Sequence, residues 1–475
     1  MRTMTWPGLC VVLLVTFVHV ESQQQPNLVF REPPRAVTGT SYCSLLNCCR
    51  GRSDSCSLPY FDTICYCDEF CNRTSASDCC PDYRPVCLGL PPPNEPTPLP
   101  QPPETDGCFH DGTYHPGGAT VRINCNQCVC QPTQTGSYEF RCQENPCLLR
   151  PTMLEAINQG DYGWQAEAYP FLYGLTLDQG LQYKLGTDPV PESVHAMRGI
   201  QVSIRDNIPE FFDARSRWPG LIQDVRDQGN CGASWAFSTT AVLADRLAIQ
   251  SRGTMTATLS PQNLLSCNTN RQRGCQGGRL DRAWWFLRKK GVTTDACYPY
   301  SSGSSAQAGQ CAVPRSNGRP YPCPSNNGDT TMKYQSSPAY KISNREEDIM
   351  KEIMTNGPVQ ATMEVKPDLF SYRSGVYRHT ELAQGEPPEY RRRGWHSVRI
   401  VGWGVEMSNP YQAPIKYWTV ANSWGKQWGE EGYFRIVRGE NECQIESFVL
   451  GVWGKVNPMV INNRVQRRRR RRSLK

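Results

Sequence analysis

Three short segments of this 475-residue chain carry side chains that could act together in nucleophilic or acid–base chemistry. Residues 228–238 read QGNCGASWAFS, residues 394–404 read GWHSVRIVGWG and residues 421–425 read ANSWG. The first segment offers the hydroxyl of Ser234. A thiol near a helix N-terminus and an imidazole can ionise, because its reference pKa is only about 8.5 and falls beside positive charge. A serine hydroxyl must instead lose its proton to a general base during attack, so Ser234 predicts a poor nucleophile.

These segments, in this order, resemble the papain-type cysteine proteases of the cathepsin B branch over residues 208–460. The resemblance implies that Ser234 stands where the family has its catalytic cysteine. It also implies that Gln228 is the oxyanion-hole amide, His396 the base and Asn422 the residue that orients the imidazole. A domain with this one replacement is expected to be inactive.

The same resemblance implies an α+β fold: a papain-like two-lobed domain, with a helical lobe and a β-barrel-like lobe, preceded by small disulfide-rich modules. Cys231 and Cys275 match a family disulfide, and Gly277 and Gly278 match the backbone wall of the substrate groove. Ser234 and His396 would then face each other across the cleft between the lobes.

Hydrophobic periodicity supports the two-lobed plan. Apolar residues at helical spacing after Ser234 predict a helix with one apolar face: Phe237, Ala241, Ala244 and Ala248. Farther along the chain, alternation predicts a half-buried strand, in which Val359, Ala361, Met363 and Val365 point inward and Gln360, Thr362 and Glu364 point outward.

Two departures from the cathepsin B pattern concern the groove. The branch trims dipeptides by means of two histidines on an occluding loop, whereas no histidine occurs here between Cys297 and Met332. Phe448 stands where cathepsin B has the acidic floor of its second substrate pocket. Trp395 is large for its place and either narrows the groove or packs as an ordinary surface aromatic residue. Restoring a thiol at position 234 is therefore not expected to restore dipeptide trimming.

The N-terminus is typical of a secretory signal peptide, at residues 1–22, because a basic residue precedes an apolar stretch from Leu9 to Val18. No later run approaches the roughly 18 apolar residues that span a bilayer, so no membrane span is expected. In a secreted chain the 24 cysteines predict disulfides. No cofactor, metal or nucleic-acid partner is expected.

Two cysteine-rich modules precede the protease-like domain. Residues 41–90 hold ten cysteines and resemble a somatomedin B domain, although that family usually has eight, which leaves the pairing open. Asn72 opens a glycosylation sequon within this module. A stiff proline-rich linker, 91–107, separates it from residues 108–148, whose six cysteines resemble a von Willebrand factor type C module. Zinc binding is the competing interpretation of this second cluster.

Residues 149–207 resemble the cathepsin B propeptide, notably around INQGDYGWQA and KLGT. A chain that cannot cut itself is expected to keep this propeptide-like segment, lying over the groove. Signal removal leaves 23 cysteines, an odd number, so at least one thiol is free or pairs between chains. The resemblance to cathepsin B makes Cys443 the candidate.

The formal net charge of +7 arises from the tail, 461–475, because the last twelve residues hold eight basic side chains and no acidic one. Such a tail predicts binding to a polyanion, in a secreted protein heparan sulfate, although it could also lack a partner or be trimmed by proprotein convertases. The side chains concerned are Arg467, Arg468, Arg469, Arg470, Arg471 and Arg472.

The order of modules along the chain resembles the tubulointerstitial nephritis antigen family. The resemblance implies a secreted protein of basement membrane or extracellular matrix, with laminin, collagen IV, fibronectin and integrins as candidate partners and several modules raising avidity. No integrin-type RGD tripeptide occurs. The alternatives are a weakly active hydrolase that uses Ser234, and a trap or inhibitor that uses an intact groove.

Overall fold

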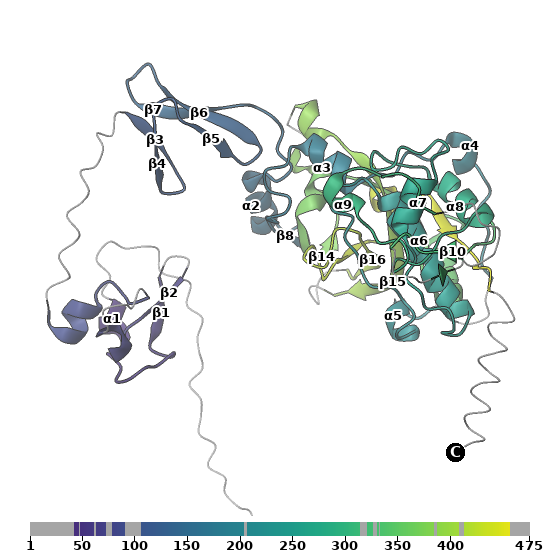
Figure 1. The fold of residues 1–475 in the computed structure, drawn as a ribbon. Coiled ribbons are helices and arrows are strands. Elements are labelled where there is room, and N and C mark those ends of the chain that lie inside the picture. Colours follow the sequence, from purple (N-terminus) through teal and green to yellow (C-terminus); the bar gives the residue numbers. More distant parts are fainter. Residues whose placement is uncertain are drawn as a thin grey trace, which may run out of the picture. The chain divides into compact units, whose positions relative to one another are not determined.

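The computed structural model describes residues 42–46, 48–60, 63–72, 78–90, 106–203, 207–313, 321–325, 330–331, 333–383, 387–407 and 413–456. They fall into two compact units, divided between Glu104 and Thr105 (Figure 1). None of the helices in these ranges is long and apolar enough to cross a membrane.

Disulfide bonds hold the first unit together. Its buried cluster consists of five cysteines and Tyr83, and the elements around it are short: α1 (Tyr42–Leu46), β1 (Ser57–Tyr60), β2 (Thr63–Tyr66), η1 (Glu69–Asn72) and η2 (Arg84–Leu88). All ten cysteines pair, which settles the pairing that the sequence left open. The bonds are Cys43–Cys67, Cys48–Cys87, Cys49–Cys56, Cys65–Cys80 and Cys71–Cys79.

The second unit begins with the type C-like module. A hairpin of β3 (Gly107–His110) and β4 (Thr113–Pro116) precedes a three-stranded sheet of β5 (Thr120–Ile123), β6 (Asn126–Pro132) and β7 (Tyr138–Cys142). Its six cysteines form three disulfides, so the zinc interpretation of this cluster is wrong, because bonded sulfurs cannot act as thiolate ligands. The pairs are Cys108–Cys130, Cys125–Cys147 and Cys128–Cys142.

The propeptide-like segment contains α2 (Pro151–Gln159), β8 (Trp164–Ala166), α3 (Leu177–Lys184) and α4 (Glu192–His195). Its strand β8 lies at the edge of a nine-stranded sheet, antiparallel to β14 (Tyr372–Tyr377). The sheet runs β12-β18-β13-β15-β16-β17-β14-β8, with β9 (Phe212–Asp213) beside β15. The other strands are β12 (Tyr340–Lys341), β13 (Val359–Val365), β15 (Gly394–Glu406), β16 (Ile415–Ala421), β17 (Tyr433–Val437) and β18 (Val449–Gly451).

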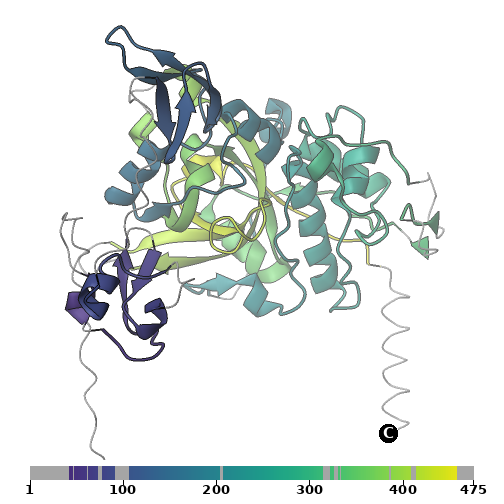
Figure 2. The same ribbon diagram turned by 60° about the vertical axis from the view of Figure 1, so that its left-hand side comes forward.

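The helical lobe surrounds α6 (Ser234–Gln250) and has its own apolar cluster, separate from that of the sheet. Figure 2 shows its helices, in teal, beside the yellow-green strands. The lobe also holds α7 (Pro261–Cys267), α8 (Leu280–Lys289), α9 (Ser302–Ser305) and the paired strands β10 (Tyr321–Pro322) and β11 (Thr330–Thr331). The remaining elements accompany the sheet: α5 (Ala214–Arg217), α10 (Glu346–Asn356), η3 (Pro367–Ser371), η4 (Glu381–Ala383), η5 (Pro388–Arg391) and η6 (Glu442–Gln444).

The predicted helix after Ser234 is confirmed, but it is buried on nearly all sides instead of one. Hydroxyl groups of the helix donate hydrogen bonds to carbonyl oxygens one turn earlier in the same helix. Ser238 Oγ donates to the carbonyl of Ser234 at 2.7 Å, and Thr239 Oγ1 donates to the carbonyl of Trp235 at 2.6 Å. Such internal bonds let polar residues enter the interior without an unpaired group.

The strand predicted over 359–365 exists as β13, but its half-buried character is wrong, because every residue of it is buried. The polar face of β13 packs against α6 and α8. Gln360 accepts a hydrogen bond from Trp284 Nε1 at 2.6 Å and donates to Ser238 Oγ at 2.8 Å. The alternation therefore marks two buried faces, one apolar and one hydrogen-bonded, between the lobes.

Candidate active site

Ser234 is the first residue of α6 and is fully buried. The disulfide between Cys231 and Cys275, predicted from the sequence, fixes the turn just before the helix. Ser234 Oγ lies 2.9 Å from Thr187 Oγ1 and accepts a longer hydrogen bond, 3.4 Å, from the backbone amide of Ser397. The hydroxyl is thus placed where both lobes and the propeptide-like segment meet.

His396 and Asn422 lie close together on the sheet side of the site. His396 Nε2 is 2.8 Å from Asn422 Oδ1, which also accepts from the backbone amide of Ser423 at 2.8 Å. Because Oδ1 accepts both bonds, Nε2 carries the proton and Nδ1 keeps a free lone pair in the neutral ring. Among the described residues Nδ1 is buried and has no hydrogen-bond partner.

Burial governs the charge of this imidazole. Desolvation lowers the pKa of His396 to about 4, and the hydrogen bond with Asn422 opposes the shift only in part. The ring of Trp424 lies 5.2 Å away, centroid to centroid, and helps to exclude water. His396 is therefore neutral at pH 7, and no imidazolium is present to stabilise a neighbouring anion.

Gln228, the predicted oxyanion-hole residue, is fully buried, and both the oxygen and the nitrogen of its side-chain amide are hydrogen-bonded. Its Oε1 accepts from Ser423 Oγ at 2.7 Å, while Nε2 lies within 3.0 Å of three carbonyl oxygens, those of Tyr183, Leu185 and Cys231. The backbone amide of Ser234 donates to the same Leu185 oxygen at 3.3 Å. A backbone carbonyl of the chain itself therefore occupies the two donors that would stabilise a developing oxyanion.

The segment Tyr183–Asp188, here called the groove segment, crosses the site between the two lobes. The amide of Gly278 donates to Gly186 at 3.0 Å, and the amide of Asp188 donates to Gly278 at 2.9 Å, so this stretch pairs in parallel with the predicted groove wall. On the other side the amide of Thr187 donates to Trp395 at 3.2 Å. The groove segment fills the groove, as expected for the propeptide-like segment.

Gly186 shows how closely the groove segment approaches the site. Its φ is +114°, and a Cβ added there would lie 2.0 Å from the carbonyl oxygen of Gly232. Neither the backbone conformation nor the space admits another residue type. Next to it, the buried Lys184 donates to the carbonyl of Gly229 at 3.0 Å, and burial lowers the pKa of this ammonium.

The rest of the propeptide-like segment is built into the core. Trp164 Nε1 donates to the carbonyl of Arg378 at 2.9 Å, and Tyr169 OH donates to that of Tyr372 at 2.8 Å. Trp164 and Tyr169 are almost completely buried and belong to the same apolar cluster as the sheet. Removing the segment would expose this cluster as well as the groove.

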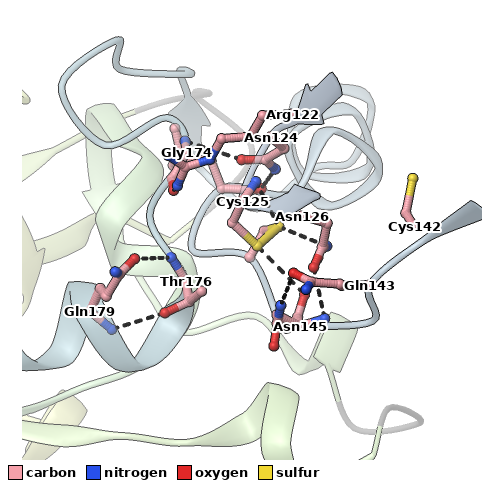
Figure 3. Close-up of a disulfide and its surroundings, with 12 residues drawn as sticks. Arg122, Asn124, Cys125, Asn126, Cys142, Gln143, Asn145, Gly174, Thr176 and Gln179 are labelled. Carbon is pink, nitrogen blue, oxygen red and sulfur yellow. Dashed lines mark hydrogen bonds between the residues drawn. A yellow bond between two sulfur atoms is a disulfide. The ribbon is translucent and has the colours of Figure 1, made fainter. Parts of the chain in front are cut away.

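The type C-like module holds the loop that leads into α3, as Figure 3 shows. Asn124 Nδ2 donates to the carbonyl of Leu149 at 2.7 Å, and Asn124 Oδ1 accepts from the amide of Gly174 at 3.3 Å. Arg122 donates to the carbonyl of Gly174. The amide of Leu148 donates to Leu175 at 2.9 Å, directly after the Cys125–Cys147 disulfide. The type C-like module thus contacts the propeptide-like segment, and the propeptide-like segment in turn contacts the groove.

The structure brings together Gln228, Ser234, His396 and Asn422, but one predicted feature lies elsewhere. Asn72 is exposed at the end of η1 in the first unit, and the rest of its sequon lies outside the described residues. Arg467–Arg472 also lie outside the described residues. The predicted free thiol at Cys443 is confirmed: it is buried, and it alone among the described cysteines has no disulfide partner.

Sequence analysis did not identify the Leu185 carbonyl or Thr187 as part of the site. The motif KLGT did mark this stretch as propeptide-like. The motif could not predict the contact between the Leu185 carbonyl and the site, since that contact depends on the path of the backbone. Phe448 is buried and stacks on His195 of the same propeptide-like segment at 6.1 Å between ring centroids, so this segment also contacts the position predicted for the second substrate pocket.

Comparison with known proteins agrees with this geometry. A family model described as "Papain family cysteine protease" matches residues 208–453. The chain is 48% identical to "Tubulointerstitial nephritis antigen-like" of Mus musculus over 470 residues, 95% of this chain and 97% of the relative. It is 44% identical to "Tubulointerstitial nephritis antigen" of Homo sapiens over 432 residues, 89% of either chain.

One solved structure extends the comparison to the fold. "proCathepsin B S9 from Trypanosoma congolense" superposes with a TM-score of 0.55 at 30% identity, covering 65% of this chain and 99% of that one. The predicted papain-like fold and the predicted family resemblance are both confirmed.

Proposed function

We propose that this chain is a secreted matricellular glycoprotein without peptidase activity. The chain belongs to the tubulointerstitial nephritis antigen family and carries a papain-family domain. The observation that carries this proposal is the state of the site: a serine hydroxyl at position 234, a neutral His396, and the Leu185 carbonyl on the oxyanion donors. The eleven disulfides among the described residues support secretion, since disulfides persist in oxidising compartments.

The proposed partners are laminin, collagen IV, fibronectin, integrins and heparan sulfate, the last through Arg467–Arg472. The test is a solid-phase binding panel with the purified full chain. Saturable binding to at least one of these partners is expected, and none at all would contradict the matricellular role. A trap for peptides needs an open groove, whereas the groove segment fills it, so this alternative is not favoured.

The absence of peptidase activity needs a separate test. The full chain should not hydrolyse cathepsin substrates or react with thiol-directed active-site probes at position 234. The matched variants are Ser234→Ala, which removes the hydroxyl, and Ser234→Cys, which supplies a thiol. Hydrolysis by the unmodified chain that disappears in Ser234→Ala would show a working serine hydrolase.

A further inference from the structure

Five basic side chains from three separate segments meet at the end of α8 in the helical lobe. The helix buries Leu280, Ala283, Trp284 and Leu287 and ends in an exposed run of cations. The basic surface, as it is called below, consists of Arg288, Lys289, Lys290, Lys333 and Lys455.

Backbone pairing brings these segments together. The amides of Val292 and Tyr334 donate to each other's carbonyl oxygens at 3.0 and 2.7 Å, which places Lys333 beside Lys290. The amide of Lys455 donates to the carbonyl of Gln335 at 2.9 Å, and Lys455 Nζ lies 3.5 Å from the carbonyl of Arg288. The basic surface is therefore part of the fold and does not depend on the tail.

Within the described ranges, four of the five cations of the basic surface lack a nearby carboxylate. In the described part of the chain, no carboxylate lies within ion-pair distance of Arg288, Lys289, Lys290 or Lys455, whereas many other bases of this domain have such a partner. The pKa of Lys333 is lowered, first by burial and then by the positive charge of Lys290. A like-charge cluster of this kind attracts anions.

Helix stability accounts for only part of this arrangement. Cations at a helix C-terminus are favoured by the helix dipole, which gives a structural reason for Arg288 and Lys289. The same reason covers Lys455, because its Nζ lies 3.5 Å from the carbonyl of Arg288 in the last turn of α8. It does not cover Lys333, which comes from another segment and lies close enough to Lys290 for the two charges to repel. Stabilising one helix end does not require five cations from three segments, and the repulsion between Lys290 and Lys333 opposes it, so this convergence indicates an anionic ligand.

We propose that the basic surface binds a linear sulfated polysaccharide. Several cations spread over a surface match a chain of repeated sulfates and carboxylates better than a single small anion. Trp285 precedes Lys289 by four residues, so it shares that side of α8, and 46% of it is exposed. A half-exposed indole beside cations suits a sugar ring, which presents apolar C–H groups. This second polyanion site is distinct from the proposed site on the tail.

The test separates the basic surface from the tail. All measurements use the full-length chain with Arg467–Arg472 replaced by serine, and heparin oligosaccharide as the probe. On this background, Lys289→Ser, Lys290→Ser and Lys455→Ser are combined. The matched control combines Arg345→Ser, Arg378→Ser and Lys426→Ser, which removes the same charge from side chains that are 60%, 49% and 62% exposed elsewhere.

The background chain should still bind heparin, and the slope of log Kd against log salt should show several ion contacts. The combined substitution in the basic surface should weaken binding at least about tenfold at physiological salt and reduce that slope by roughly 2 to 3, because each lost contact contributes just under one to it. The control should change Kd less than about twofold, since its charges lie outside the contact. Thermal unfolding of each variant checks that the fold is retained.

Three outcomes would overturn the proposal: no heparin binding by the background chain, equal loss in both combined variants, or equal binding of desulfated heparin. Tight binding of duplex DNA with the same variant profile would overturn the assignment to a polysaccharide. These results bear on only one arm of the matrix panel, heparan sulfate. The laminin, collagen IV, fibronectin and integrin arms and the peptidase test are independent of them, so the two proposals can fail separately.

Discussion

Replacing Asn124 by glycine should loosen the groove segment, although Asn124 lies in the type C-like module. Asn124 has φ of +51°, a left-handed conformation that glycine adopts without strain, so the substitution removes the side chain and leaves the turn intact. The hydrogen bonds lost are those to Leu149 and Gly174. Each contributes about 0.5–1.5 kcal/mol net, so the docking of the module weakens by about 1–3 kcal/mol.

Hydrogen exchange at the groove measures this effect without any need for activity. The amides of Gly278 and Asp188 are protected by bonds that exist only while the groove segment is in place. If the module, α3 and the groove segment open as one unit, 1–3 kcal/mol corresponds to exchange about 5- to 150-fold faster at both amides. Amides within α6 should keep their wild-type rates.

The control is Asn126→Ala, which removes a similar side-chain amide whose bonds to Asn145, 2.8 and 3.1 Å long, stay inside the module. It should leave exchange at Gly278 unchanged. The reasoning is refuted if Asn124→Gly speeds exchange at Gly174 but leaves Gly278 and Asp188 at wild-type rates. In that case the module and the groove open independently.

Three further predictions concern the interior and the processing of the chain. The pKa of His396 is about 4 in the folded chain and about 6.5 in the unfolded chain, so its contribution to stability is complete above pH 6.5 and is lost as the pH falls toward 4. Between pH 7 and pH 4, urea unfolding should therefore show the free energy of unfolding falling by about 3 kcal/mol more in wild type than in His396→Gln. Equal losses of stability in the two proteins would contradict this. Burial, together with Glu442 and Asp368, raises the pKa of the Cys443 thiol well above its usual value, so iodoacetamide at pH 8 should label it only after unfolding, and rapid labelling of the native chain would contradict its burial. N-terminal sequencing of the secreted protein should find the propeptide-like segment attached, whereas a dominant species beginning near Ile208 would show that another protease removes it.

The sequence predicted the site better than it predicted the surroundings. Gln228, Ser234, His396 and Asn422 came together as their motifs implied, because each motif places its side chain on a helix, a strand or the turn beside one. The burial of β13 was missed, since Gln360 alternates with apolar residues like a surface strand and only the packing of α6 and α8 supplies its partners. The Leu185 carbonyl was missed for a related reason: a backbone oxygen is present at every residue, so no residue type marks it.

The proposed lack of peptidase activity and the predicted retention of the propeptide-like segment are physically connected. In a chain that removes this segment, the side chains beneath it must tolerate water, which limits how deeply it can be built into the core. Here Trp164 and Tyr169 are 4% and 3% exposed and bond to the backbone of the sheet, and the type C-like module in turn rests on the loop before α3. Excising the segment would expose apolar surface to water and would remove these hydrogen bonds, each contributing about 0.5–1.5 kcal/mol net. The propeptide-like segment thus serves as the structural joint between the papain-like domain and the modules that precede it.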